Sequence, residues 1–299
     1  MPITTKPQLA TLADGARLVD IAHAARIVGD VVTNAKVISN NKTFDDYELK
    51  AALKGESPAV KAAAMAAYNS AKNDATAKGK LVTRFDVSKK LDQALAAAKK
   101  ADKDQDGELS EKELGKLQSW TPLRLAVAAV ELKDVPTGKM ATADFLEAAN
   151  AIMRGVTVIS EGDSPLIAFA TAKTSQGITP DNILKTFKAT LDKEYADYTL
   201  DNGLVAEVST SAKAKKMLSD SAKPDADADD PIEAQVDADA YASLKKLFAA
   251  NLTDVRFVRI GPADDDGTLG VDRGMYVEGY VGKTADGKLA GMYWTSAET

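Results

Sequence analysis

The sequence predicts two domains of different fold class: an all-α domain of helix–loop–helix units over about residues 1–140, then an α+β domain, an α-β-α sandwich, over about residues 141–299. Apolar residues recur at spacings of three and four in the first half, which indicates amphipathic helices. Short apolar segments separated by turn signals dominate the end of the chain, which indicates strands. With 299 residues, the chain is long enough for each domain to have its own core.

The net charge changes sign between the two predicted domains. Residues 1–140 contain 22 Lys and Arg against 18 Asp and Glu, a net charge of +4, whereas residues 141–299 contain 16 against 26, a net charge of −10. The acidic second domain argues against direct binding to nucleic acid and favours a protein partner with a basic surface.

Helices are predicted throughout the first domain. One covers about residues 14–36, and an alanine-rich helix begins at Pro58 and covers residues 58–72. Two more cover residues 86–101 and 111–118, on either side of an acidic loop. This succession of helices joined by short loops is what predicts the all-α class.

Helices and strands alternate in the second domain. Helices are expected at residues 142–153, 179–187 and 241–252, and strands at residues 156–160, 166–173, 254–261, 274–284 and 288–298. The pair Asp286-Gly287 is a hairpin signal between the last two strands. Residues 223–239, rich in Asp, Ala and Pro, are expected to form a solvated acidic loop.

Residues 102–113 place oxygen-bearing side chains at alternate positions, with Gly107 at the sixth position for a sharp turn. A hard cation such as Ca²⁺ prefers about six to eight oxygen ligands, and alternate residues of a tight loop direct their side chains inward. The spacing resembles the calcium-binding loop of the EF-hand family at every ligand position. It implies a Ca²⁺ site with five side-chain ligands and one backbone carbonyl, that of the seventh residue: Asp102, Asp104, Asp106, Ser110, Glu113 and the carbonyl of Glu108.

Three further segments resemble EF-hand loops in shape and lack the ligands: residues 37–48, 74–85 and 133–144. Val37 stands at the first position of one and Phe85 at the last position of another, and neither side chain can bind a cation. We expect no calcium at these segments. Four loops suggest two EF-hand pairs, and ordinary connections between helices are the alternative for the three degenerate segments.

The residue types exclude several kinds of chemistry. The chain has no cysteine and one histidine, His23, so disulfides, thiol catalysis and multi-histidine zinc sites are excluded, and a protein without enzymatic activity is expected. No segment is apolar over the roughly 18 residues that a membrane span requires. Because the N-terminus lacks a secretory signal, a cytoplasmic location is favoured, with a processed periplasmic or secreted form as the alternative.

Two segments of the second domain, residues 158–166 (VISEGDSPL) and 241–299, are similar to the nuclease A inhibitor family. The most telling part is the final hairpin, GKTADGKLAG, with a strand that runs to the last residue. Members of that family block a nonspecific DNA/RNA endonuclease that carries a divalent metal in its active site. The resemblance implies that Thr299 meets the metal of the nuclease and that Glu161 contacts its active site, with Glu298 as a further contact.

The first hypothesis is therefore a calcium-binding inhibitor of a nonspecific metal-dependent endonuclease. A terminal Thr offers a carboxylate and a hydroxyl to a hard cation, which suits a plug for a metal-containing cleft. The alternative is a calcium sensor or buffer whose C-terminal domain binds a protein partner other than a nuclease. A hydrolase would have carboxylates available, but no motif supports that activity.

Overall fold

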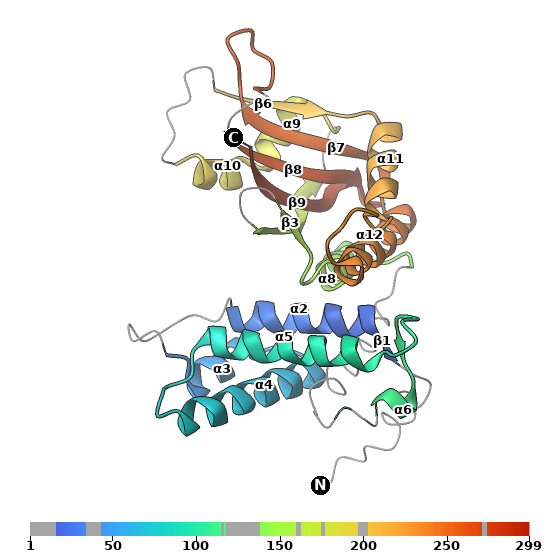
Figure 1. Ribbon diagram of the computed structural model, residues 1–299. Helices are drawn as coiled ribbons and strands as arrows, with labels where there is room; N and C mark the ends of the chain where they lie inside the picture. The colour runs from blue at the N-terminus through green and yellow to red at the C-terminus, as the bar shows by residue number, and fades with distance from the viewer. Residues whose placement is uncertain are drawn as a thin grey trace. The chain divides into compact units, whose positions relative to one another are not determined.

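The computed structural model describes residues 16–33, 43–114, 117, 138–159, 163–174, 177–196, 203–270 and 274–298. The chain divides into two units (Figure 1): unit 1 comprises Met1–Asp134 and Asp227–Val236, and unit 2 comprises Val135–Ala226 and Asp237–Thr299. Within the described ranges, no helix combines the length and the apolar character that crossing a bilayer demands.

Unit 1 consists mainly of helices: α2 (Leu18–Thr33), α3 (Asp46–Ala52), α4 (Pro58–Ala77), α5 (Arg84–Ala101), α6 (Glu111–Leu114) and the first turn of α12 (Pro231–Asn251). Ser57 caps α4 and Pro58 occupies its first turn, while Thr83 and Asp86 form a capping box at the start of α5. The core combines large side chains such as Ile21, Leu49 and Tyr68 with buried alanines of α4. Small residues at these positions let neighbouring helices approach closely.

A two-stranded antiparallel sheet joins the two ends of the helical part of unit 1. Strand β1 (Ala16–Arg17) pairs with β2 (Glu108–Leu109), with Ala16 opposite Leu109 and Arg17 opposite Glu108. The predicted helix over residues 14–36 therefore begins only at Leu18. Strands of two residues are too short to show a period of two, so hydrophobic periodicity did not reveal them.

The fold class predicted from the sequence is wrong. Helices dominate the N-terminal part, but the β1–β2 sheet means that this part is not all-α, and residues 227–236 from far along the chain belong to the same unit. Taken as a whole, the described chain is mixed α and β, with one five-stranded antiparallel sheet and two two-stranded sheets.

Unit 2 is built on the five-stranded sheet, whose strand order is β5-β9-β8-β7-β6. The strands are β5 (Ile167–Thr174), β6 (Leu204–Val208), β7 (Thr253–Pro262), β8 (Gly274–Lys283) and β9 (Lys288–Glu298). Gly287 has φ +80° in the turn between β8 and β9, as the hairpin signal predicts. A separate hairpin is formed by β3 (Thr157–Ile159) and β4 (Asp163–Pro165).

Helices cover both faces of this sheet, with α9 and α10 on one side and α11 and α12 on the other (Figure 1). The bounds are α8 (Thr142–Ile152), α9 (Pro180–Thr186), α10 (Lys188–Glu194) and α11 (Ser211–Ser221). On one face, Phe145 of α8 and Phe248 of α12 share a core with Tyr280. On the other, Ile183 of α9 shares a core with Val277. Alternation along β8 sends Val277 and Tyr280 to opposite faces.

Helix α12 overturns the prediction of an acidic loop over residues 223–239. The helix begins at Pro231, so its first nine residues fall in the segment that was expected to be a loop. Asp230 caps it, because the backbone N–H groups of Ile232 and Glu233 donate to Asp230 Oδ1 at 3.1 and 3.3 Å. The acidic composition masked the pair Asp230-Pro231, which is a helix-start signal.

Candidate calcium site

The predicted calcium loop connects α5, which ends at Ala101, with α6, which begins at Glu111. Strand β2 occupies the second half of the loop, and Leu109 at its end is completely buried in the core of unit 1. The backbone N–H of Leu18 also donates to the carbonyl of Gly107 at 2.8 Å, which extends the pairing with β1. The loop is therefore fixed by secondary structure on both sides of its turn.

Asp102 closes the first half of the loop through its own side chain. The backbone N–H of Gln105 donates to Asp102 Oδ1 at 2.8 Å, and that of Gly107 donates to Asp102 Oδ2 at 3.1 Å. Gln105 and Gly107 have φ +59° and +80°, in the left-handed region that a tight turn requires. The Asp102 side chain is held within the loop, and the residue is only 9% exposed.

Three carboxylates converge inside this turn. Asp102, Asp104 and Asp106 each offer an oxygen, and these oxygens lie within 4.8 Å of one another. The negative charge of Asp106, with smaller contributions from burial and from Glu113, raises the pKa of Asp104 above its ordinary value. Within the described ranges, no other group of three Asp, Glu or His side chains is close enough to share a metal ion.

Glu113 joins the end of the loop to its beginning. The backbone N–H of Lys103 donates to Glu113 Oε1 at 2.9 Å, while the backbone N–H and the hydroxyl of Ser110 donate to Oε2 at 3.1 and 2.8 Å. A carboxylate has about four lone-pair sites, and these three donors occupy three of them. The hydroxyl of Ser110 has to release Oε2 before both oxygens of Glu113 can face a cation, and its own oxygen is then available as a ligand.

The structure thus brings three of the predicted ligands together, Asp102, Asp104 and Asp106, whereas Glu113 lies outside that cluster. The three aspartates form the cluster, Glu113 and Ser110 are hydrogen-bonded to each other, and Glu108 lies in β2 with its backbone N–H donating to Asp106 Oδ1 at 2.8 Å. An all-oxygen donor set suits Ca²⁺, Mg²⁺ or Mn²⁺ and is unsuited to metals that prefer thiolate or imidazole. The residues present fit a bound Ca²⁺.

One of the three degenerate segments, residues 74–85, does not form the loop that the sequence predicted. Asp74 lies within α4, so the connection expected over residues 74–85 is confined to residues 78–83, and Phe85 lies in α5. Residues 37–42 and 133–137 lie outside the described residues. Ordinary helix connection, the alternative left open by the sequence, describes residues 78–83.

Two other turns of unit 1 resemble the end of the calcium loop: in each, an acidic side chain accepts a hydrogen bond from the backbone N–H of the residue three positions before it. Asp45 and Glu48 form a capping box on α3, as Thr83 and Asp86 do on α5, and the backbone N–H of Phe44 donates to the carbonyl of Val82 at 2.9 Å. The turns are therefore neighbours, but their carboxylates bind their own helix ends. The pairing of the calcium loop with β1 was not predicted, although the turn signal Asp14-Gly15 directly precedes Ala16.

The predicted contacts to a nuclease fall at the limits of the described chain. Glu161 and Thr299 lie outside the described residues, and Glu298 is the last residue of β9, opposite Gly274. The elements around them are joined: Ser164 Oγ of β4 lies 3.0 Å from Thr295 Oγ1 of β9, and the backbone N–H of Thr295 donates to Ser164 Oγ at 3.1 Å.

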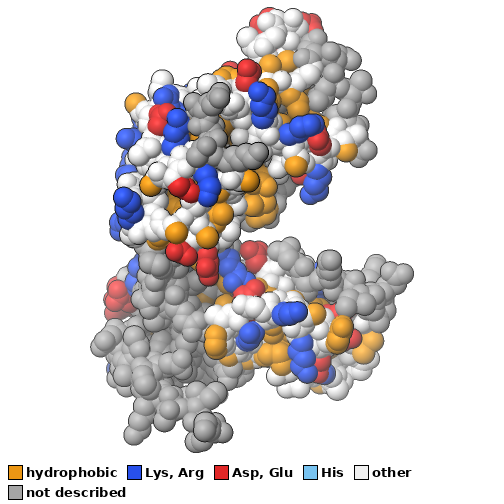
Figure 2. Space-filling model, turned by 180° about the vertical axis from the view of Figure 1, so that it is seen from behind, with side chains coloured by type: hydrophobic (Ala, Val, Ile, Leu, Met, Phe, Trp, Pro, Cys, Tyr) orange, Lys and Arg blue, Asp and Glu red, His pale blue; other side chains and the backbone are white. Residues whose placement is uncertain are grey.

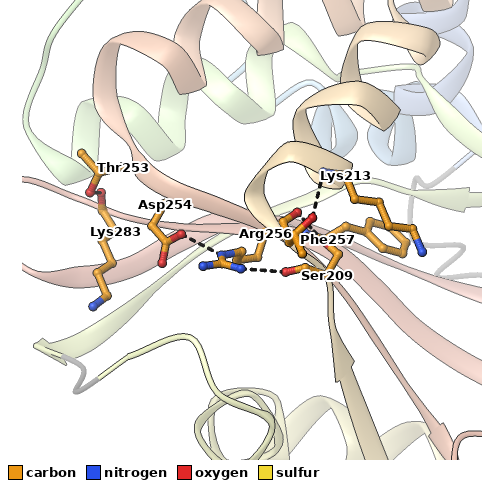
Figure 3. A network of polar contacts seen from close by, with 8 residues as sticks. Ser209, Lys213, Thr253, Asp254, Arg256, Phe257 and Lys283 are labelled. Atoms are coloured by element: carbon orange, nitrogen blue, oxygen red, sulfur yellow. Dashed lines mark hydrogen bonds and ion pairs between the residues drawn. The ribbon is translucent and has the colours of Figure 1, made fainter.

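A polar network at the start of β7 was not predicted (Figure 3). Arg256 donates from Nε to Asp254 Oδ1 at 2.7 Å and from a terminal nitrogen to the carbonyl of Ser209 at 3.1 Å, and the backbone N–H of Phe257 donates to Ser209 Oγ at 2.9 Å. The register of β7 with β8 shifts here, and Asp254 has φ +50°. The contacts join β7 to the segment between β6 and α11, which gives the network a structural role.

No model of a known protein family matches the chain, and no curated protein matches it either. What the protein does has to be inferred from its own residues.

Proposed function

We propose that the protein binds Ca²⁺ at residues 102–113 and that its C-terminal unit inhibits a nonspecific, metal-dependent endonuclease. The calcium part rests on one observation, the convergence of the Asp102, Asp104 and Asp106 carboxylates within 4.8 Å. Repulsion between these charges is relieved when a cation lies between them. Ca²⁺ is favoured over Mg²⁺ because a carboxylate that ligates with both oxygens, as proposed for Glu113, suits the larger and more flexible shell of Ca²⁺.

Isothermal titration calorimetry on the full chain, stripped of metal with a chelator, tests the calcium part. CaCl₂ should bind at one site, and MgCl₂ should bind more weakly. The substitution Asp104→Asn should lower calcium affinity, whereas Asp92→Asn, which neutralises an exposed carboxylate on α5, should leave it unchanged. Equal affinity in the two variants would show that the cation binds elsewhere.

Nuclease inhibition is supported by the arrangement of the elements that carry the predicted contacts. The hairpin β3–β4 spans position 161, β9 ends at Glu298, and the Ser164–Thr295 hydrogen bonds connect the two. Because these strands are held together by hydrogen bonds, residues at their ends would lose less conformational entropy on entering the cleft of a nuclease. The acidic character of residues 141–299 suits a groove that normally binds nucleic acid.

The test is digestion of plasmid DNA by a nonspecific ββα-metal endonuclease in the presence of the full chain. Digestion should stop at a stoichiometric ratio, and deletion of Thr299 or the substitution Glu161→Ala should restore it. The substitution Glu147→Ala, at an exposed position of α8, serves as the control and should still inhibit. Undiminished digestion with an excess of the unaltered protein would contradict inhibition. The calcium sensor or buffer with a non-nuclease partner would then be the better account.

A further inference from the structure

Unit 1 exposes large apolar side chains on neighbouring segments. Tyr47 is 69% exposed, Leu81 71% and Phe85 75%, and Ile167 is the only other large hydrophobic residue counted as exposed within the described ranges. The Phe44–Val82 backbone hydrogen bond joins the segment that carries Tyr47 to the one that carries Leu81 and Phe85. Three such residues on joined segments differ from the scattered single apolar residues that are normal on a protein surface.

Leu81 stands between two hollows in the surface. One, of about 440 Å³, has Phe44, Tyr47 and Tyr68 in its wall, and the other, of about 390 Å³, lies between the end of α4 and the start of α5. Both Lys80 and Leu81 line the two hollows. Lys80 and Leu81 therefore form a ridge with a hollow on each side. Such a ridge offers a bound peptide an apolar contact at Leu81 and two hollows that its side chains can enter.

The second hollow is basic. Its lining includes four lysines and two aspartates. Asp74 is paired with Lys90 at 2.5 Å, and Asp86 accepts hydrogen bonds from Thr83 in the capping box. The other three lysines form no ion pair with any residue that the structure describes: Lys78, Lys80 and Lys89. Figure 2 shows Lys/Arg and hydrophobic side chains beside one another on the described part of unit 1.

We infer that the ridge of Lys80 and Leu81, together with the two hollows beside it, binds an acidic segment of another protein. That segment contains at least one large apolar side chain. The lysines supply charge complementarity, and the exposed Leu and aromatic residues supply apolar contact area. Carboxylates that line the first hollow, such as Asp45, would repel the closely spaced phosphates of a nucleic acid or of an anionic membrane. A peptide can avoid them because its charges are separated by neutral residues.

A phage-displayed library of random 12-residue peptides, selected on the immobilised full chain, tests the inference. Enriched peptides should combine Asp or Glu with Leu, Phe or Trp, and their affinity, measured by fluorescence anisotropy of a labelled peptide, should fall as salt rises. The substitutions Leu81→Ser and Lys80→Glu should each weaken binding of the best peptide at least about tenfold. The controls Ile167→Ser and Lys188→Glu change an exposed apolar residue and an exposed lysine of unit 2, and should leave affinity unchanged.

Circular dichroism and calcium titration should be the same for all four variants as for the unaltered protein, which separates lost contacts from lost folding. Peptides without acidic and apolar enrichment, or binding that tolerates both ridge substitutions, would overturn the inference. So would tighter binding of a 12-nucleotide RNA or of phosphatidylserine vesicles than of the selected peptide. A dimer in analytical ultracentrifugation that Leu81→Ser dissociates would replace the acidic partner with a second copy of the chain.

Discussion

The backbone N–H of Lys103 donates to Glu113 Oε1 at 2.9 Å, across a separation of ten residues. The second and last positions of the calcium loop are thereby joined through a carboxylate that is only 8% exposed. Glu113 has a structural role in the loop independent of any cation, since it also accepts from Ser110 at the start of α6. Its role as a ligand must therefore be separated experimentally from its role in holding the loop.

The substitution Glu113→Gln should lower calcium affinity at least about tenfold, equivalent to about 1.4 kcal/mol. Gln keeps one acceptor oxygen, so one of the two backbone N–H groups, Lys103 or Ser110, loses its acceptor, and the charge and one ligand oxygen are removed. Glu48→Gln is the matched control, because Glu48 holds the same capping-box position on α3, accepts from the backbone N–H of Asp45 at 3.1 Å and is buried. Calorimetry should show unchanged affinity for the control; an equal loss in both variants would attribute the effect to helix capping.

The substitution Leu109→Ala should destabilise unit 1 by about 2–5 kcal/mol, because it empties a fully buried site in the core and loosens the β1–β2 pairing. The same change at Leu81, which is 71% exposed, should alter the free energy of unfolding by no more than about 0.5 kcal/mol. Urea unfolding followed by circular dichroism measures both. Similar losses at the two positions would mean that Leu109 is not part of the core.

The substitution Gly291→Ala should destabilise unit 2 by about 3 kcal/mol or more. A Cβ at this position of β9 would lie 1.8 Å from the carbonyl oxygen of Tyr280, so strands β8 and β9 would have to separate locally. Gly138→Ala is the control, since a Cβ there meets nothing within 4 Å. Differential scanning calorimetry should show a lower unfolding temperature for Gly291→Ala alone.

The substitution Asp230→Ala should cost about 1 kcal/mol through loss of the cap on α12. Asp230→Asn should cost less, because Asn is an equally good cap and removes only the partly exposed ion pair with Lys99, at 2.6 Å. Hydrogen exchange of the first turn of α12 distinguishes the two. Equal protection in the unaltered protein and the Ala variant would show that the cap does not hold this helix end.

Sequence patterns predicted long helices well, since α4 and α5 begin with a proline and a capping box and bury a stripe of small or apolar residues. They also predicted the cluster of Asp102, Asp104 and Asp106, because alternate acids in a tight loop have few other arrangements. They failed for β1, whose two residues show no period, and for the start of α12, where acidic composition concealed a helix. The pairing of β1 involves residues far along the chain, which local patterns do not encode, whereas the start of α12 has a local signal, Asp230-Pro231, that its acidic surroundings concealed.

The pairing of Ala16 with Leu109 has a consequence for the kinetics of folding. The two residues are 93 positions apart (109 − 16), so the calcium loop acquires its β-sheet partner only when distant parts of the chain have come together. Such contacts lower folding rates because a large loop must close before they form. A cation bound at the loop would then stabilise an arrangement that is completed late, so calcium should slow unfolding of unit 1 and change its refolding rate little.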